Sequence, residues 1–189
     1  LSHPENYGIH NLPDGFSSFT YDSLKKETIS YENLLAALKT FDPEKLTHSQ
    51  QILYEILEDK LSLQLEERKY LSLSESLGPT TGIQAQLPVL LAEFRIEDAS
   101  DLSQYFSLLR TLPRYFSSLL SVEEKKKQLG TLPCRSTLTH IITQCESYLN
   151  DQGTSILVST FTRKIAQADF LTEKERRKAI RKSKELIQK

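Results

Sequence analysis

The amino-acid sequence predicts an all-α protein, a multi-helix bundle whose helices are joined by short Gly/Pro turns. Three observations predict this fold class. Apolar residues recur at three- and four-residue spacing along most of the chain. Helix-start motifs of the Ser/Thr-x-x-Glu/Gln type occur at Thr47 and Thr172. Between the periodic runs, Gly and Pro gather in short clusters that end helices.

Composition excludes several classes of protein. The 24 Lys and Arg residues nearly balance the 25 Asp and Glu residues, which argues against a general nucleic-acid binder. The longest stretch without charge, residues 76–92, is interrupted by Pro79, Gly82 and Pro88, so no bilayer-spanning segment is predicted. Two cysteines are too few for a disulfide scaffold.

Both ends suggest a piece of a larger protein. The chain starts at Leu1 and contains no Met, and it stops inside the helix-like run 174–189. We therefore expect residues 1–189 to be a single helical domain from the N-terminal or internal part of a longer polypeptide. Residues 1–19 are expected to be irregular, and residues 173–189 to form an exposed C-terminal helix.

The first two helices have clear boundaries. The first is predicted to begin with Asp22 as its N-cap and to end before Pro43, because a residue preceding proline avoids helical geometry. The second begins at Thr47, paired with Gln50 in a capping box, and runs to about Tyr70. Its apolar positions are Ile52, Leu53, Ile56, Leu57, Leu61 and Leu65. A helix of this length needs partners along it, which favours a bundle.

The middle of the chain alternates turns and helices. Residues 77–83 form a turn, and residues 84–94 a helix with Pro88 near its start, although a short strand over 87–91 is an alternative. The next helix starts near Asp98, and Pro113 should kink or break it. Residues 125–127, all Lys, are expected to be a solvated helix end before a Gly130 cap.

The last third predicts two or three helices. Ser136 is expected to cap a helix with the best amphipathic stripe of the chain, formed by Leu138, Ile141, Ile142, Cys145 and Leu149. Residues 154–168 fit a strand or a helix equally well. Thr172 and Glu175 form a second capping box that opens a final, mostly polar helix.

No catalytic or metal-binding residue is predicted. The histidines His3, His10, His48 and His140 are scattered, and none stands in an H-E-x-x-H motif. Cys134 and Cys145 are interpreted as structural thiols, with nothing near Cys134 to hold a thiolate. The acidic pairs at 58–59, 66–67 and 123–124 are interpreted as solvent-facing charge. The basic cluster at 174–184 is interpreted as an exposed helix rather than a nucleic-acid or lipid site, because it has no aromatic residue for base stacking.

Residues 77–94, LGPTTGIQAQLPVLLAEF, carry a resemblance. The stretch resembles the bacterial "domain of unknown function 885" proteins, in which a glycine-rich turn leads into a Leu-Pro-x-Leu-Leu-Ala-Glu run. Residues 98–116 agree with that family's acidic helix start and repeated Tyr and Leu, and residues 4–9 and 46–65 look like its N-terminal portion.

The resemblance implies a large, mostly helical bacterial protein, often secreted or lipid-anchored at the cell surface. Its later half carries an H-E-x-x-x-x-H-like, zinc-peptidase-like signature, and no position of this sequence matches that signature. The resemblance thus implies a non-catalytic helical segment of a zinc-dependent metallopeptidase-like protein, with zinc in the parent protein. Its partners would be the remainder of the parent polypeptide and a peptide substrate. The alternative is a free-standing helical protein–protein interaction module.

The turn before the third helix is the candidate ligand loop, with Gly78, Thr80, Thr81, Gly82 and Gln84 as its candidate residues. Glycines allow close backbone approach to a ligand, and the threonine and glutamine side chains can hydrogen-bond a peptide backbone. The competing interpretation is a turn that only positions the following helix.

Overall fold

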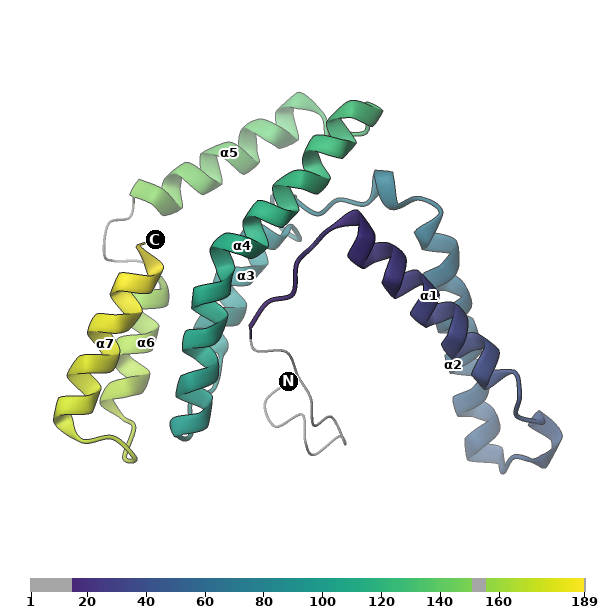
Figure 1. Ribbon diagram of the computed structural model, residues 1–189, viewed down its shortest axis with the longest axis horizontal. Helices are drawn as coiled ribbons and strands as arrows, with labels where there is room; N and C mark the ends of the chain where they lie inside the picture. Colours follow the sequence, from purple (N-terminus) through teal and green to yellow (C-terminus); the bar gives the residue numbers. More distant parts are fainter. Residues whose placement is uncertain (1–14, 151–155, 189) are drawn as a thin grey trace. The chain divides into compact units, whose positions relative to one another are not determined.

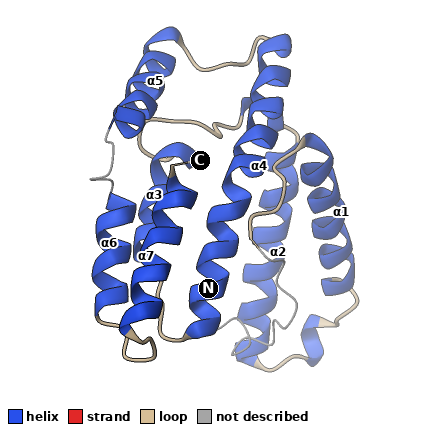
Figure 2. Cartoon of the chain, turned by 60° about the vertical axis from the view of Figure 1, so that its left-hand side comes forward, coloured by secondary structure: helices blue, strands red, loops and turns tan. Residues whose placement is uncertain are grey.

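The computed structural model describes residues 15–150 and 156–188, and every regular element in these ranges is a helix (Figures 1 and 2). The elements are α1 Tyr21–Leu38, η2 Pro43–Lys45, α2 His48–Arg68, η3 Leu71–Leu73, α3 Ile83–Glu93, α4 Ala99–Leu129, α5 Arg135–Asn150, α6 Ile156–Ala166 and α7 Glu173–Ile187. The predicted all-α class is confirmed. The strand alternatives over 87–91 and 154–168 are wrong for the described residues, because residues 87–91 lie in α3 and residues 156–166 form α6.

The described chain divides into two compact units. One contains residues 15–18, 75–117 and 133–188, and the other contains residues 19–74 and 118–132. Helix α4 supplies residues to both, because the division falls within it.

The larger unit is organised around an aromatic core. Tyr105 of α4 is 1% exposed and stacks on Phe161 of α6, with ring centroids 5.0 Å apart and planes 13° from parallel. The remaining buried members of this core are Leu87, Leu91, Phe106, Leu109, Ile165 and Ala179. Four helices, α3, α4, α6 and α7, therefore share one apolar centre. Burial raises the pKa of Tyr105 to about 12.

Cationic side chains fasten the helix ends of this unit. Lys164 of α6 donates hydrogen bonds to the carbonyl oxygens of Ala92 and Phe94, at 2.5 and 2.7 Å, where α3 ends. Arg176 of α7 donates to the carbonyl of Ala168, which follows α6. A cation at a helix C-terminus satisfies carbonyls that lack an intrahelical partner. Desolvation is the main cause that lowers the pKa of Lys164.

The smaller unit contains the antiparallel pair of helices α1 and α2, which lie side by side (Figure 1). Their more buried residues recur at three- and four-residue spacing, as along the seam of a coiled coil. On α1 these are Tyr21, Leu24, Thr28, Tyr31, Leu35 and Leu38, and on α2 Gln51, Tyr54, Glu58, Leu61, Leu65 and Arg68. No residue of α2 is fully buried, and the helix packs against α1 along this seam.

Lys126 corrects the prediction of a solvated lysine run. Lys125 and Lys127 are exposed, but Lys126 is 1% exposed and donates to the carbonyl of Ser74 at 2.7 Å. Its ammonium also lies 3.4 Å from a carboxylate oxygen of Glu123, whose side chain is 11% exposed. A buried ammonium needs such partners, so this lysine joins α4 to the segment after η3. The expectation of solvent-facing charge at 123–124 is therefore wrong for Glu123.

Two helix starts, those of α1 and α5, fall near the predicted positions but not on them. Thr20, not Asp22, is the N-cap of α1, because its hydroxyl and Ser23 form a reciprocal pair. Helix α5 begins at Arg135, one residue before the predicted cap Ser136. The capping boxes at 47–50 and 172–175 and the Gly130 end of α4 are confirmed.

Two prolines lie inside helices. Helix α4 runs through Pro113 over 31 residues, so of the two predicted outcomes, a kink or a break, the break is wrong. Pro88 is the sixth residue of α3, not part of its first turn. Each proline removes one backbone hydrogen bond, and apolar packing by neighbours such as Leu87, Leu91 and Leu109 offsets that loss.

The predicted stripe on α5 is mostly exposed. Ile141 is the one buried residue of this helix, whereas Ile142 and Leu149 are 57% and 78% exposed. The amphipathic pattern identified the helix correctly but not its burial.

Replacing Lys164 by Met should lower the free energy of unfolding by about 1–3 kcal/mol, because two carbonyls at the end of α3 lose a charged donor. The measurement is urea unfolding followed by far-ultraviolet circular dichroism. Lys174→Met, at an exposed position of α7, should change the stability by no more than about 0.5 kcal/mol. Equal midpoints for the two variants would contradict the capping role.

Stability should fall as the pH rises from 10 to 12, because an unfolded tyrosine ionises near 10 while folded Tyr105 keeps its proton to about 12. This group contributes a loss of up to about 2–3 kcal/mol. Urea unfolding at pH 8 and pH 11 should show a smaller loss for Tyr105→Phe than for the unsubstituted chain. Tyr148→Phe, at an exposed position, should keep the full loss.

Candidate functional site

The turn before α3 is closed by its own backbone. The amide of Gly82 donates to the carbonyl of Gly78 at 3.2 Å, and the amide of Ile83 donates to the carbonyl of Ser76 at 3.0 Å. Gly78 and Gly82 are both buried. Gly82 is the N-cap residue of α3, so the geometry of the turn fixes where this helix begins.

The side chain of Gln84 is used within the protein. Gln84 is 7% exposed, and its Nε2 donates to the carbonyl of Gly78 at 2.6 Å and to Oε1 of Gln144 at 3.0 Å. Gln144 of α5 in turn donates from Nε2 to the carbonyl of Pro79 at 3.2 Å. These bonds form an amide clasp, which we define as Gln84, Gln144 and the carbonyls of Gly78 and Pro79. It ties α5 to the turn.

The five candidate residues thus separate into two groups. Gly78, Gly82 and Gln84 lie together in the buried part of the turn, whereas Thr80 and Thr81 are exposed. Oε1 of Gln84 is buried and accepts no hydrogen bond from the described residues. The turn contains no ionisable side chain between Gly78 and Gln84, so its chemistry is restricted to neutral hydrogen bonding.

The two thiols have different environments. Hydrogen bonds from the Thr137 hydroxyl and from backbone amides at the start of α5 lower the pKa of Cys134, which is exposed. Burial is the main cause that raises the pKa of Cys145. Both cysteines are free, as predicted, and the Thr137 hydroxyl lies 3.3 Å from the Cys134 sulfur. The Thr three residues after this Cys is the sequence pattern that could have indicated this contact.

The described residues do not fit a zinc site. Within the two described ranges, no three His, Cys, Asp or Glu side chains gather as metal ligands. His48 begins α2 and His140 lies exposed on α5, while the predictions for His3 and His10 fall outside the described residues.

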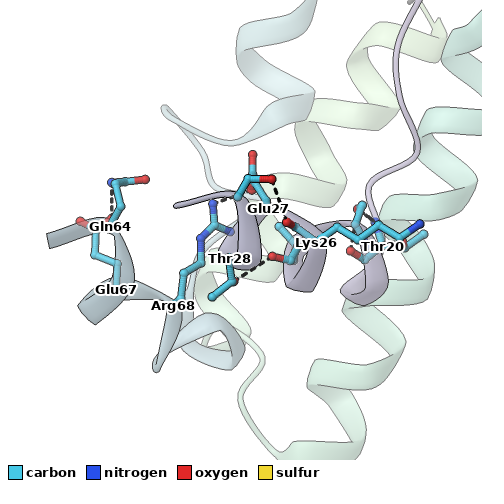
Figure 3. Close-up of polar contacts among 10 residues, drawn as sticks. Thr20, Lys26, Glu27, Thr28, Gln64, Glu67 and Arg68 are labelled. Carbon is cyan, nitrogen blue, oxygen red and sulfur yellow. Dashed lines mark hydrogen bonds and ion pairs between the residues drawn. The ribbon is translucent and has the colours of Figure 1, made fainter. Parts of the chain in front are cut away.

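A groove runs between α1 and α2, with a volume of about 610 Å³. At its edge, Arg68 of α2 forms an ion pair with Glu27 of α1 at 2.5 Å (Figure 3). The guanidinium of Arg68 also lies 5.4 Å from the ring centre of Tyr31. Lys69 is paired with Glu66, which raises the pKa of Lys69. This groove joins residues about 40 positions apart, and no local motif in the sequence indicates it.

None of the helices in the described ranges combines the length and the apolar character that crossing a bilayer requires. This agrees with the prediction from residues 76–92.

One solved structure has a similar fold. It is described as "the putative lipoprotein from Colwellia psychrerythraea", and it superposes with a TM-score of 0.73 at 10% sequence identity. The match covers 90% of this chain and 31% of that chain, so this chain spans about a third of the length of its structural neighbour. At this identity the likeness shows the fold alone. Among curated proteins, no match is found.

The family assignment rests on nearly the whole sequence. The family model described as "Bacterial protein of unknown function (DUF885)" matches residues 6–189. These residues include the turn and helix α3, where the sequence resemblance is strictest. The chain therefore belongs to the DUF885 family of bacterial proteins of unknown function.

Proposed function

We propose that this chain is a non-catalytic helical segment of a larger, zinc-dependent metallopeptidase-like bacterial protein. One observation supports the role of a segment: the chain shares its fold with a solved protein chain of which it spans only 31%. The zinc-dependent, metallopeptidase-like character of the parent is what the family resemblance implies. The zinc ligands and the catalytic groups would then lie in other parts of the parent polypeptide. The description of the structural neighbour as a lipoprotein supports a secreted or lipid-anchored location for that parent.

The internal contacts suit a bracing role. Lys164 and Arg176 hold the ends of helices, and the amide clasp joins α3 to α5, so the helices of the larger unit keep fixed positions. A catalytic constellation must be held to within a fraction of an ångström by rigid supporting elements. Such a segment would contribute to hydrolysis by supporting the residues that perform it.

A free-standing interaction module is the second candidate function. The exposed aliphatic side chains of α2 favour it, because exposed apolar patches mark sites of protein contact. The length of the natural polypeptide separates the two candidates. A metallopeptidase-like parent requires an H-E-x-x-H-type motif downstream of this chain, whereas an interaction module requires none.

In the proposed protein, the candidate ligand loop would contact the peptide substrate. Thr80 and Thr81 would contact a peptide substrate through their exposed hydroxyls, and the buried Gly78, Gly82 and Gln84 would hold the turn in shape. Gly82 is needed for close approach, because a Cβ atom there would overlap the amide nitrogen of Gly78. A Cβ atom on Gly78 would lie 3.6 Å from the amide nitrogen of Gly82, which is an ordinary contact.

The 189-residue chain should hydrolyse no peptide with or without added zinc, whereas the full-length protein should hydrolyse peptides and lose this activity with a chelator. The measurement uses a mixed library of fluorogenic peptides. Zinc restored to the chelated full-length protein is the control, and it should recover the activity. Chelator-sensitive hydrolysis by the 189-residue chain would contradict the non-catalytic role.

Substitutions in the loop should distinguish residues that maintain the conformation of the turn from residues that contact the substrate. Gly82→Ala should lower the free energy of unfolding by about 1–3 kcal/mol because of overlap with Gly78. Gly78→Ala is the matched control and should leave the stability nearly unchanged. Thr80→Val with Thr81→Val should keep the thermal midpoint and raise the KM of the full-length protein for peptides.

An unchanged KM in the double threonine variant would leave the loop with a positioning role only. Equal stability of the two alanine variants would contradict the close approach at Gly82. Neither result depends on the other, because one measures catalysis and the other unfolding.

A further inference from the structure

The face of α2 turned away from α1 carries an aliphatic stripe. Its members are Ile52, Leu53, Ile56, Leu57 and Leu63, which are between 38% and 59% exposed. At 100° per residue, Ile52, Ile56 and Leu63 lie within about 40° of one another around the helix, and Leu53 and Leu57 both lie on one side of them, with Leu57 next to the seam toward α1. We call these five residues the outer stripe.

The outer stripe is costly to leave in water. Burying a Leu or Ile side chain fully is worth about 1.5–3 kcal/mol, and five neighbouring residues on one helix expose much of that apolar surface. Polar residues occur on both faces of α2: Gln51, Glu58 and Arg68 along the seam toward α1, and Lys60 and Glu67 beside the outer stripe. The seam is covered by α1, whereas the outer stripe leaves five aliphatic side chains exposed, as expected of a surface that binds another element.

The outer stripe has an acidic edge. Glu55, Asp59 and Glu66 follow one another along one side of it, at four- and seven-residue spacing. Glu66 is paired with Lys69, whereas Glu55 and Asp59 make no ion pair within the described residues. A helix that covers the stripe therefore gains from Lys or Arg residues on its facing edge.

These charges disfavour a second copy as the occupant. In a two-fold antiparallel pairing of α2 helices centred on Leu57, Glu55 of each copy lies opposite Asp59 of the other. Facing carboxylates repel each other and would be desolvated together. The acidic edge is therefore suited to a basic partner and not to itself.

We propose that the outer stripe is the docking surface for an amphipathic helix from another part of the same full-length polypeptide, with an aliphatic face and Lys or Arg along one edge. This inference rests on the proposed function, in which the chain is a segment of a longer protein. The structural neighbour supports this source, because 69% of its chain lies outside the match, given the 31% that is covered. The contact has the form of an amphipathic helix laid on an apolar surface.

Thiol labelling in the 189-residue chain and in the full-length protein tests this docking. Ile56→Cys places a thiol in the outer stripe, and Asn33→Cys places one at an exposed polar position of α1. Labelling by a hydrophilic maleimide is followed peptide by peptide with mass spectrometry, so Cys134 and Cys145 are scored separately. Position 56 should react at least about tenfold more slowly in the full-length protein, while position 33 reacts equally in both.

A charge reversal tests the acidic edge. Glu55→Lys with Asp59→Lys, added to the Ile56→Cys variant, should restore most of the labelling rate in the full-length protein. Glu44→Lys, at an exposed position of η2, is the matched control and should leave the protection unchanged.

Equal labelling of position 56 in both proteins would overturn the docking proposal. So would protection already present in the 189-residue chain together with a dimer mass in sedimentation, which would assign the surface to a second copy. A natural polypeptide that ends at Lys189 would overturn the docking proposal and the proposed function together. Equal labelling in a full-length protein that shows chelator-sensitive hydrolysis would overturn the docking proposal alone.

Discussion

The stacking of Tyr105 on Phe161 is the contact on which the larger unit depends. It joins α4 to α6, and it is surrounded by aliphatic side chains from α3 and α7, so four helices that are separate in sequence meet around two rings. Aromatic pairs contribute more than their buried area, because offset rings also attract each other electrostatically. Once these rings are in place, the cationic contacts at Lys164 and Arg176 fix the ends of the helices around them.

The helix pair α1 and α2 of the smaller unit is held together by mixed polar and apolar contacts and not by an aromatic core. Its two long helices meet along a narrow seam in which Leu35 and Leu61 alternate with polar residues such as Glu58 and Arg68. A pair of helices held in this way has little buried apolar surface of its own, and the ion pair between Arg68 and Glu27 adds only modest stability at a partly exposed site. The two helices therefore leave aliphatic side chains of α2 exposed, among them the outer stripe.

Much of the fold could be predicted from the sequence, because helix starts and ends are local. Thr47 and Thr172 cap helix starts and Gly130 ends a helix, and each acts on backbone groups within a few residues. These roles can therefore be predicted without knowledge of the fold. Burial was harder to predict. Lys126 is buried because the carbonyl of Ser74, 52 residues away, accepts its hydrogen bond, and Ile142 is exposed although its spacing is that of a core residue.

In the candidate site, too, local features could be predicted from the sequence and long-range contacts could not. The glycine-rich sequence predicted a defined turn, and that turn exists, but the bond from Gln84 to Gln144 depends on a helix 60 residues further on. The lowering of the pKa of Cys134 depends on where α5 starts, which sequence patterns place only approximately.

The amide clasp also determines how the contact between α5 and the turn responds to its surroundings. Its donors and acceptors are amides and carbonyls, and none of them gains or loses a proton between acid and alkaline conditions. Mobile ions screen interactions between charges and have little effect on neutral hydrogen bonds. The attachment of α5 to the turn is therefore insensitive to acidity and ionic strength, so this part of the framework stays intact when either of them changes.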